Sequence, residues 1–113
     1  MANIVYLDID QGSDFSSEIS LENDDDTPID LRSFNVYSQF RKNYNSTVGY
    51  QFDAVISNAI QGKIMLSLSG TASSAIRPGR YLYDVEIVDI VNSRKTRVIE
   101  GIITINAEIT KIP

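Results

Sequence analysis

The sequence predicts an all-β domain. Apolar residues recur at every second position along most of the chain, which is the period of a half-buried β-strand. Segments rich in Gly, Pro, Asn, Asp and Ser interrupt this alternation about every ten residues. No long window keeps the apolar spacing of a helix. These patterns are typical of an antiparallel immunoglobulin-like β-sandwich of about seven to eight strands, with a small β-barrel as the alternative.

The predicted strands follow one another along the chain. They cover residues 4–9, 15–21, 34–41, 48–56, 64–68, 81–87 and 97–105. The run Asn23–Pro28 between the second and third strands is a turn, because Asn and Asp favour turns and Pro has no amide hydrogen to donate. We expect segments 34–41 and 48–56 to form a hairpin or to lie side by side.

One segment has helical character. Residues Ser69–Ile76 are rich in Ala and Ser, but so short a helix is unstable in isolation, and at most one helical turn is expected there. In the strand that follows, Tyr81 and Tyr83 are in register with apolar residues and are expected in the core. Gly101 interrupts the last strand and predicts a bulge or a close backbone approach.

The composition limits the chemistry available to this chain. Its 113 residues predict a single domain over residues 1–113, with no room for a separate catalytic module. The chain has no cysteine and no histidine. By itself it therefore offers no thiol nucleophile, no disulfide and no imidazole for acid–base catalysis or zinc binding.

The charges divide unevenly along the chain. Residues 1–31 hold nine acids and no base, and residues 32–113 hold six acids and ten bases, so the two parts carry −9 and +4 for a net charge of −5. Nucleic acids and anionic membranes bind basic faces, so neither is an expected partner. No apolar run is long enough to cross a membrane, and the first residues lack the features of a signal peptide. We therefore expect synthesis in a cytoplasm.

Two acidic segments have some features of a cation site. Residues 8–14 place carboxylates at alternating positions around a Gly, but the twelfth residue counted from Asp8 is Ile19, where an EF-hand loop has Glu. The consecutive acids Asp24, Asp25 and Asp26 are typical of a hydrated loop tip. The sequence therefore predicts no metal and no cofactor.

No residue pattern predicts an enzyme. Asp84 and Glu86 share a strand face, but the outward face of a small domain offers little cleft for glycoside hydrolysis. A cross-strand arginine, Arg97 or Arg94, is the simpler partner for these acids. The serines have no histidine and no Ser-x-x-Lys spacing to activate them. We expect no catalytic residues.

Several short strings occur in the order found in small virion proteins of tailed phages. The chain resembles this group, including the N-terminal domains of baseplate upper proteins from phages of Gram-positive hosts. The matching strings lie at residues 11–15, 27–31, 40–41, 62–64, 67–69, 78–85, 97–101 and 109–110. Baseplate upper proteins continue into a further region, whereas this sequence stops at Pro113, which favours a stand-alone decoration or adaptor role.

The resemblance implies a non-enzymatic structural component of a tailed-phage virion, as a capsid decoration or a neck, tail or baseplate adaptor. Such a protein is made in the host cytoplasm and located in the virion. Its partners are other virion proteins and further copies of itself, because an acidic segment on one copy attracts the more basic remainder of its neighbour. The possible assembly contacts are surface charges: Asp24, Asp25, Asp26, Arg41, Arg94 and Lys95.

The alternative function is a carbohydrate-binding module of a host-attachment apparatus. Tyr37 and Tyr44 fall outside the predicted core register and are candidates for a stacking surface. The chain contains no tryptophan, the residue most often used for a sugar platform, and no basic groove with interleaved aromatic residues for single-stranded nucleic acid.

Overall fold

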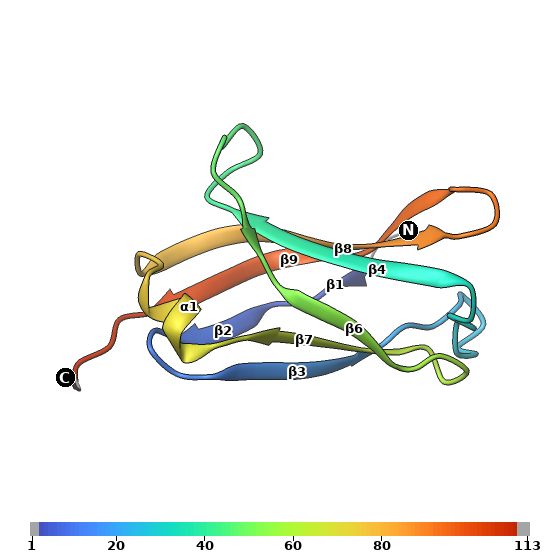
Figure 1. Cartoon of the computed structure of the whole chain (residues 1–113), viewed down its shortest axis with the longest axis horizontal. Coiled ribbons are helices and arrows are strands. Elements are labelled where there is room, and N and C mark those ends of the chain that lie inside the picture. Colours follow the sequence, from blue (N-terminus) through green and yellow to red (C-terminus); the bar gives the residue numbers. More distant parts are fainter. Residues whose placement is uncertain (1–2, 111–113) are drawn as a thin grey trace.

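The computed structural model describes residues 3–110, which form two β-sheets packed face to face (Figure 1). The larger sheet has the strand order β5, β4, β8, β9, with β1 and β2 both beside β9, and the smaller sheet has the order β3, β7, β6. The elements are β1 (Asn3–Ile4), β2 (Leu7–Asp10), β3 (Phe15–Ser20), β4 (Phe34–Arg41), β5 (Tyr50–Gln51), β6 (Asp53–Asn58), β7 (Lys63–Leu68), α1 (Gly70–Ser74), β8 (Gly79–Asp89) and β9 (Lys95–Asn106). The all-β prediction is confirmed, and the sheets do not close into a barrel.

The expectation of an entirely antiparallel sandwich is wrong at one edge. The first strands run parallel to the last one, with Asn3 opposite Ile99 and Leu7 opposite Ile103. Parallel neighbours need a long connection, and almost the whole chain lies between β2 and β9. The next strand, β3, belongs to the other sheet, so β1 and β2 pair with β9, the last strand of the sequence.

Two of the predicted strands are divided. The segment 4–9 separates into β1 and β2, and the segment 48–56 separates into β5 and β6. The expected hairpin with β4 is limited to Gln51 opposite Gln39 and Tyr50 opposite Phe40. After the buried Phe52 the chain crosses to the smaller sheet, where Asp53 lies opposite Ser67. Alternation alone predicts strand length but not a change of sheet.

The expected helical turn is present as α1. Ser69 caps it, because the Ser69 hydroxyl accepts a hydrogen bond of 3.1 Å from the amide of Ala72. The carboxylate of Asp14 accepts a bond of 2.6 Å from the amide of Gly70, which joins this turn to the β2–β3 connection. Ser73 is fully buried, and its hydroxyl donates to the carbonyl of Ser13. Within residues 3–110, no helix is long and apolar enough to span a membrane.

The core between the sheets contains a group of aromatic side chains. The ring of Phe40 lies 4.9 Å from that of Phe52 and 5.7 Å from that of Tyr81, the latter in an edge-to-face arrangement. Tyr81 and Tyr83 are buried, as predicted, and each directs its hydroxyl to a backbone carbonyl. These hydrogen bonds allow the polar ends of two tyrosines to lie in an apolar layer without a loss of bonding.

The first segment touches β9 at Gly101. The amide of Val5 donates to the carbonyl of Glu100 at 3.0 Å, and the carbonyl of Val5 accepts a bond of 2.7 Å from the hydroxyl of Tyr83. A Cβ atom built on Gly101 would lie 2.0 Å from the Val5 oxygen. The predicted close approach at Gly101 is therefore confirmed, whereas the bulge in β9 lies between Ile99 and Arg97.

Gly101→Ala is expected to destabilise the fold by about 1–3 kcal/mol, because the added methyl group would push the backbone of Val5 away from the backbone of β9. Chemical denaturation measures the loss, and hydrogen exchange should show faster exchange of the Val5 amide. Gly49→Ala is the matched control, since the atoms nearest to its Cβ belong to the guanidinium of Arg41, 2.7 Å away at the end of a flexible side chain, and not to the backbone. Equal stabilities for the two variants would contradict the close approach.

Tyr83→Phe is expected to lower stability at pH 7 by about 1–2 kcal/mol, because the carbonyl of half-buried Val5 loses its donor. Burial raises the pKa of Tyr83 to about 12. The folded state therefore keeps the proton while the unfolded chain loses it near pH 10, so this contribution is fully present below pH 10 and declines toward pH 12.

The stability difference between wild type and Tyr83→Phe should consequently narrow as the pH rises from 10 to 12, which denaturation curves at each pH measure. Tyr37→Phe, at an exposed position, should keep the wild-type stability at pH 7. If the stability difference between wild type and Tyr83→Phe stays constant or widens as the pH rises, burial does not keep the proton on Tyr83.

Candidate functional site

One end of the sandwich brings together three loops, which we call the loop end: residues 21–33, 59–62 and 89–95. The amide of Leu31 donates to the carbonyl of Ala59 at 2.8 Å, and the amide of Ile90 donates to the carbonyl of Ser33 at 2.9 Å. Figure 1 shows these loops on the right, beyond the ends of β3, β6 and β8. Segments distant in the sequence therefore form one continuous surface.

Five of the six predicted assembly residues lie at the loop end. Asp24, Asp25 and Asp26 occupy the tip between β3 and β4, and Arg94 and Lys95 lie where the chain turns from β8 into β9. All five are exposed. The structure thus places charges of both signs at the same end of the molecule.

The acidic tip has a defined shape. The Asp25 carboxylate accepts bonds from the hydroxyl of Thr27 at 2.6 Å and from the amide of Thr27 at 3.1 Å. These bonds, the hydroxyl bond first, hold the pKa of Asp25 below its usual range. Asp26 adopts a positive φ of 66°, a conformation that Asp tolerates better than most residues. The three carboxylates are therefore presented on an ordered turn.

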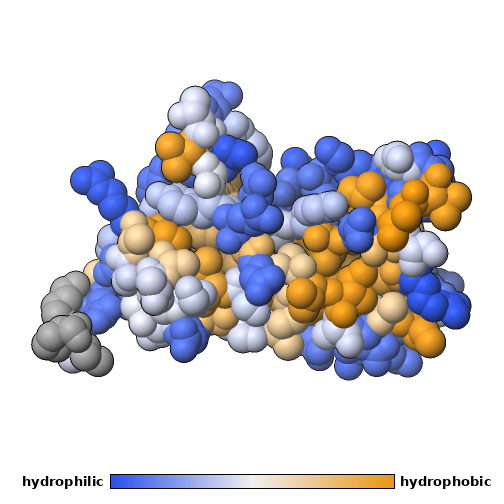
Figure 2. All heavy atoms as spheres, viewed as in Figure 1, coloured by the Kyte–Doolittle hydropathy of each residue, from blue (hydrophilic) through white to orange (hydrophobic). Residues whose placement is uncertain are grey.

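Exposed apolar side chains accompany these charges. At the loop end Ile60 is 61% exposed, Ile90 58% and Val91 84%. In Figure 2 hydrophobic residues are visible at the β8–β9 hairpin, beside blue polar ones. Apolar groups rimmed by charges are typical of surfaces that another protein covers.

The sixth predicted residue, Arg41, lies apart from the others. It ends β4, whose first residue, Phe34, adjoins the loop end, so Arg41 is a full strand length away. Its guanidinium donates to the side-chain oxygen of Gln39 at 2.9 Å and to the carbonyl of Ser46 at 3.2 Å. Arg41 therefore positions the β4–β5 loop and belongs to a different surface.

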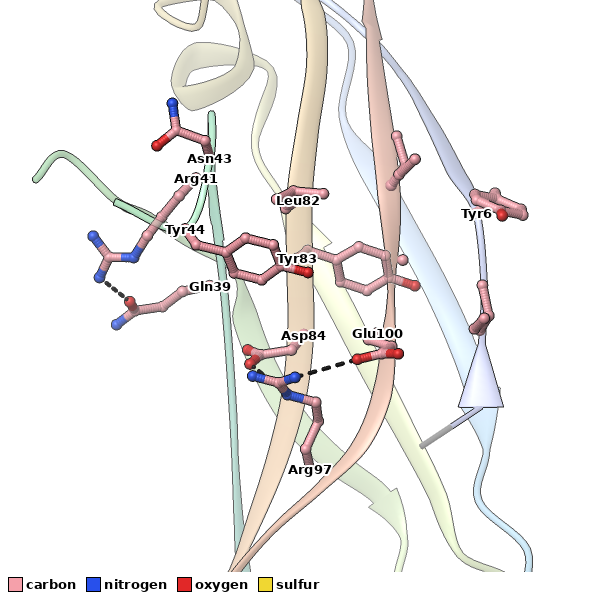
Figure 3. A pocket seen from close by; sticks show the side chains of 13 residues that line it. Tyr6, Gln39, Arg41, Asn43, Tyr44, Leu82, Tyr83, Asp84, Arg97 and Glu100 are labelled. Carbon is pink, nitrogen blue, oxygen red and sulfur yellow. Dashed lines mark hydrogen bonds and ion pairs between the residues drawn. The ribbon is translucent and has the colours of Figure 1, made fainter. Parts of the chain in front are cut away.

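That second surface is a depression of about 410 Å³ on the outer face of the larger sheet. It extends over β4, β8 and β9 to the segment that joins β1 to β2. Figure 3 shows Tyr44 over β8 on one side and Tyr6 on the opposite side, with a row of charged residues further down β8 and β9. Tyr6 is 70% exposed and Tyr44 80%.

The charged row consists of Asp84, Arg97 and Glu100. The guanidinium of Arg97 lies 3.1 Å from a carboxylate oxygen of Asp84 and 3.2 Å from one of Glu100. Attraction to Asp84 is the main cause that raises the pKa of Arg97. The predicted cross-strand partner of Asp84 is thus confirmed as Arg97.

The bulge in β9 explains how Arg97 reaches this face. Val85 pairs with Ile99, but the next residue of β8, Glu86, pairs with Arg97, so Val98 is the extra residue. Simple alternation would place Arg97 on the same face as the buried Ile99. The bulge reverses this and brings Arg97 beside Asp84.

Sequence reasoning names several lining residues of the depression, among them Arg41, Tyr44, Asp84 and Arg97, but does not bring them together in one site. It does not predict Tyr6, Gln39 or Glu100, and the other candidate tyrosine, Tyr37, lies outside the depression. The alternation along this segment does contain a signal for Tyr6. Leu7 and Ile9 are buried, so the even-numbered residues beside them, Tyr6 among them, face the outer side of the sheet.

The acidic segment 8–14 has structural roles. Asp8 and Asp10 point outward from β2, and Asp14 binds the amide of Gly70. In the part of the chain that the structure describes, no group of three or more His, Cys, Asp or Glu residues could hold a metal ion.

Comparisons with known proteins show a likeness of fold. No protein-family model and no curated protein sequence matches the chain. Among solved structures, InlP of Listeria monocytogenes is similar over 92% of this chain and 26% of InlP, with 16% identity and a TM-score of 0.51. A family 123 glycoside hydrolase from Clostridium perfringens is similar over 91% of this chain and 22% of that enzyme, with 11% identity and a TM-score of 0.41.

This chain therefore spans about a quarter of the length of InlP. At this level of identity the likeness concerns the β-rich fold, and the residues of the depression and the loop end take no role from it.

Proposed function

We propose that the chain is a non-enzymatic structural component of a tailed-phage virion, a capsid decoration or a neck, tail or baseplate adaptor, that acts by protein–protein assembly. The observation that carries the proposal is the loop end, where apolar side chains and charges of both signs are exposed together. Its partners are further copies of the chain and other virion proteins, not nucleic acid or membrane, and its location is the virion.

The finer fold that we propose is an immunoglobulin-like sandwich. Two features support it: the first strands flank the last strand in the larger sheet, and Tyr81 near the start of β8 donates to the carbonyl of Arg77 at 2.7 Å. A tyrosine at this corner that binds backbone a few residues upstream is characteristic of such sandwiches. This fold serves many functions, so the assembly role rests on the surface and on the resemblance.

Charge complementarity gives the loop end a means of self-association. The acidic tip of one copy faces the basic hairpin of the next, and the exposed Ile60, Ile90 and Val91 lose water at the contact. Exposed ion pairs contribute little by themselves, so burial of the apolar groups supplies most of the stabilisation. The charges fix the register and raise the association rate.

Opposite charge reversals test this arrangement. Glu22 is exposed two residues before Asp24 and adds to the negative charge of the tip. Arg94→Glu/Lys95→Glu and Glu22→Lys/Asp24→Lys should each shift the protein from a discrete oligomer toward monomer in sedimentation velocity runs. An equal mixture of the two variants should regain the oligomer, because the reversed charges again face their opposites. The wild-type oligomer should weaken as salt increases.

The apolar contribution has its own matched pair. Val91→Ser should weaken association at least about tenfold with unchanged stability. Val48 is an exposed residue of the β4–β5 loop, so Val48→Ser should leave association unchanged.

Mass spectrometry of purified phage particles should detect the chain. A monomer at every salt concentration, or particles that lack the protein, would overturn the assembly function.

A further inference from the structure

The depression between Tyr6 and Tyr44 has the features of a ligand site separate from the loop end. It lies on the outer face of the larger sheet. Two of its lining residues, Arg41 and Tyr44, lie at or beyond the end of β4 that is far from the acidic tip. Its volume of about 410 Å³ falls within the roughly 300–1,000 Å³ of small-ligand sites. Two tyrosines this exposed on one face need an explanation beyond packing, since neither ring contributes to the core.

The base of the depression combines apolar and polar groups. Half-buried Leu82 and Ile102 provide an apolar strip at the base of the depression. Next to it lies the ordered row of Asp84, Arg97 and Glu100, whose hydrogen bonds fix the positions of the carboxylates and the guanidinium. Each carboxylate keeps oxygen lone pairs that this row does not use.

The charges of the depression cancel. Arg41 and Arg97 contribute two positive charges, and Asp84 and Glu100 contribute two negative charges, so their sum is zero. Asp84 and Glu100 both form ion pairs with Arg97. These pairs offset the positive charge that Arg97 would otherwise offer to an incoming anion. A phosphate or a carboxylate ligand would have to compete with these ion pairs, whereas an uncharged ligand need not.

We propose that this depression binds a neutral oligosaccharide. The apolar face of a sugar ring fits against the exposed ring of Tyr6 or Tyr44, because aromatic rings bury apolar area while their hydroxyls stay in water. The vicinal hydroxyls of the same sugar donate to the carboxylates of Asp84 and Glu100 and accept from the amide of Asn43 or the guanidinium of Arg97. The open shape admits an internal segment of a longer glycan.

The same geometry disfavours a protein occupant. The depression is on the face of a sheet rather than at its edge, so it offers no free backbone groups to an added strand. Its lining includes the ion-paired Asp84, Arg97 and Glu100, whereas the core of a protein interface is depleted of charged residues.

The test is a titration monitored by ¹H–¹⁵N NMR with four uncharged hexasaccharides: cellohexaose, maltohexaose, laminarihexaose and fully N-acetylated chitohexaose. At least one should shift the amides of residues 4–6, 39–44, 82–84 and 97–102 and leave those of the loop end in place. Tyr6→Ala and Tyr44→Ala should each weaken that binding about tenfold, and the double variant should abolish it. Both side chains are exposed, so these variants are expected to fold.

Tyr37→Ala is the matched control, because Tyr37 is 50% exposed on the same face of β4 but does not line the depression. Its affinity should equal that of the wild type. The proposal is overturned if none of the four sugars shifts these amides at 10 mM, if the double tyrosine variant binds normally, or if only the anionic comparator polygalacturonate binds.

Failure here is distinguishable from failure of the assembly function. The charge-reversal variants of the loop end should retain sugar binding, and the tyrosine variants should retain the wild-type oligomer. Loss of both properties in one variant would show that the two surfaces are not independent and would contradict the assignment of sugar binding to the depression.

Discussion

The attachment of the first segment to β9 is the contact on which the rest of the structure depends. At Gly101 the backbone of Val5 approaches so closely that no side chain fits between them, and Tyr83 ties the same carbonyl to the core from β8. This contact brings together residues from both ends of the chain, so the larger sheet is complete only when the whole domain has folded. It also places Tyr6 at the margin of the depression.

The two candidate surfaces arise from opposite features of the sandwich. The loop end depends on turns, whose ordered carboxylates and exposed apolar tips are held by backbone hydrogen bonds between loops. The depression depends on the regular face of the larger sheet, modified by one bulge and one glycine. The loop end and the lining of the depression have no residue in common, so the proposed assembly contact and the proposed sugar site do not exclude each other.

The depression also shows why charged rows on sheets are poor indicators of catalysis. Asp84 and Glu100 lie close enough to share Arg97, but Arg97 remains protonated and binds both, so neither is isolated from a counter-charge. A general acid in a glycosidase needs an environment that raises its pKa, usually an apolar pocket. The sugar site that we propose needs only hydrogen bonding from these groups.

The sequence by itself determined the β-rich character, the core register of Tyr81 and Tyr83 and the helical turn after Ser69, and it limited Gly101 to a bulge or a close backbone approach. These features follow from local periodicity and from the conformational properties of single residues. Tertiary structure alone decided the parallel pairing of β1 and β2 with β9, the crossing at Phe52, and the placement of Asp24 and Arg94 at the same end of the sandwich. The physical reason is that periodicity specifies which face of a strand is buried, but not which strand lies beside it. The bulge at Val98 adds a second limit, because one inserted residue moves Arg97 to the other face without any change in the local pattern.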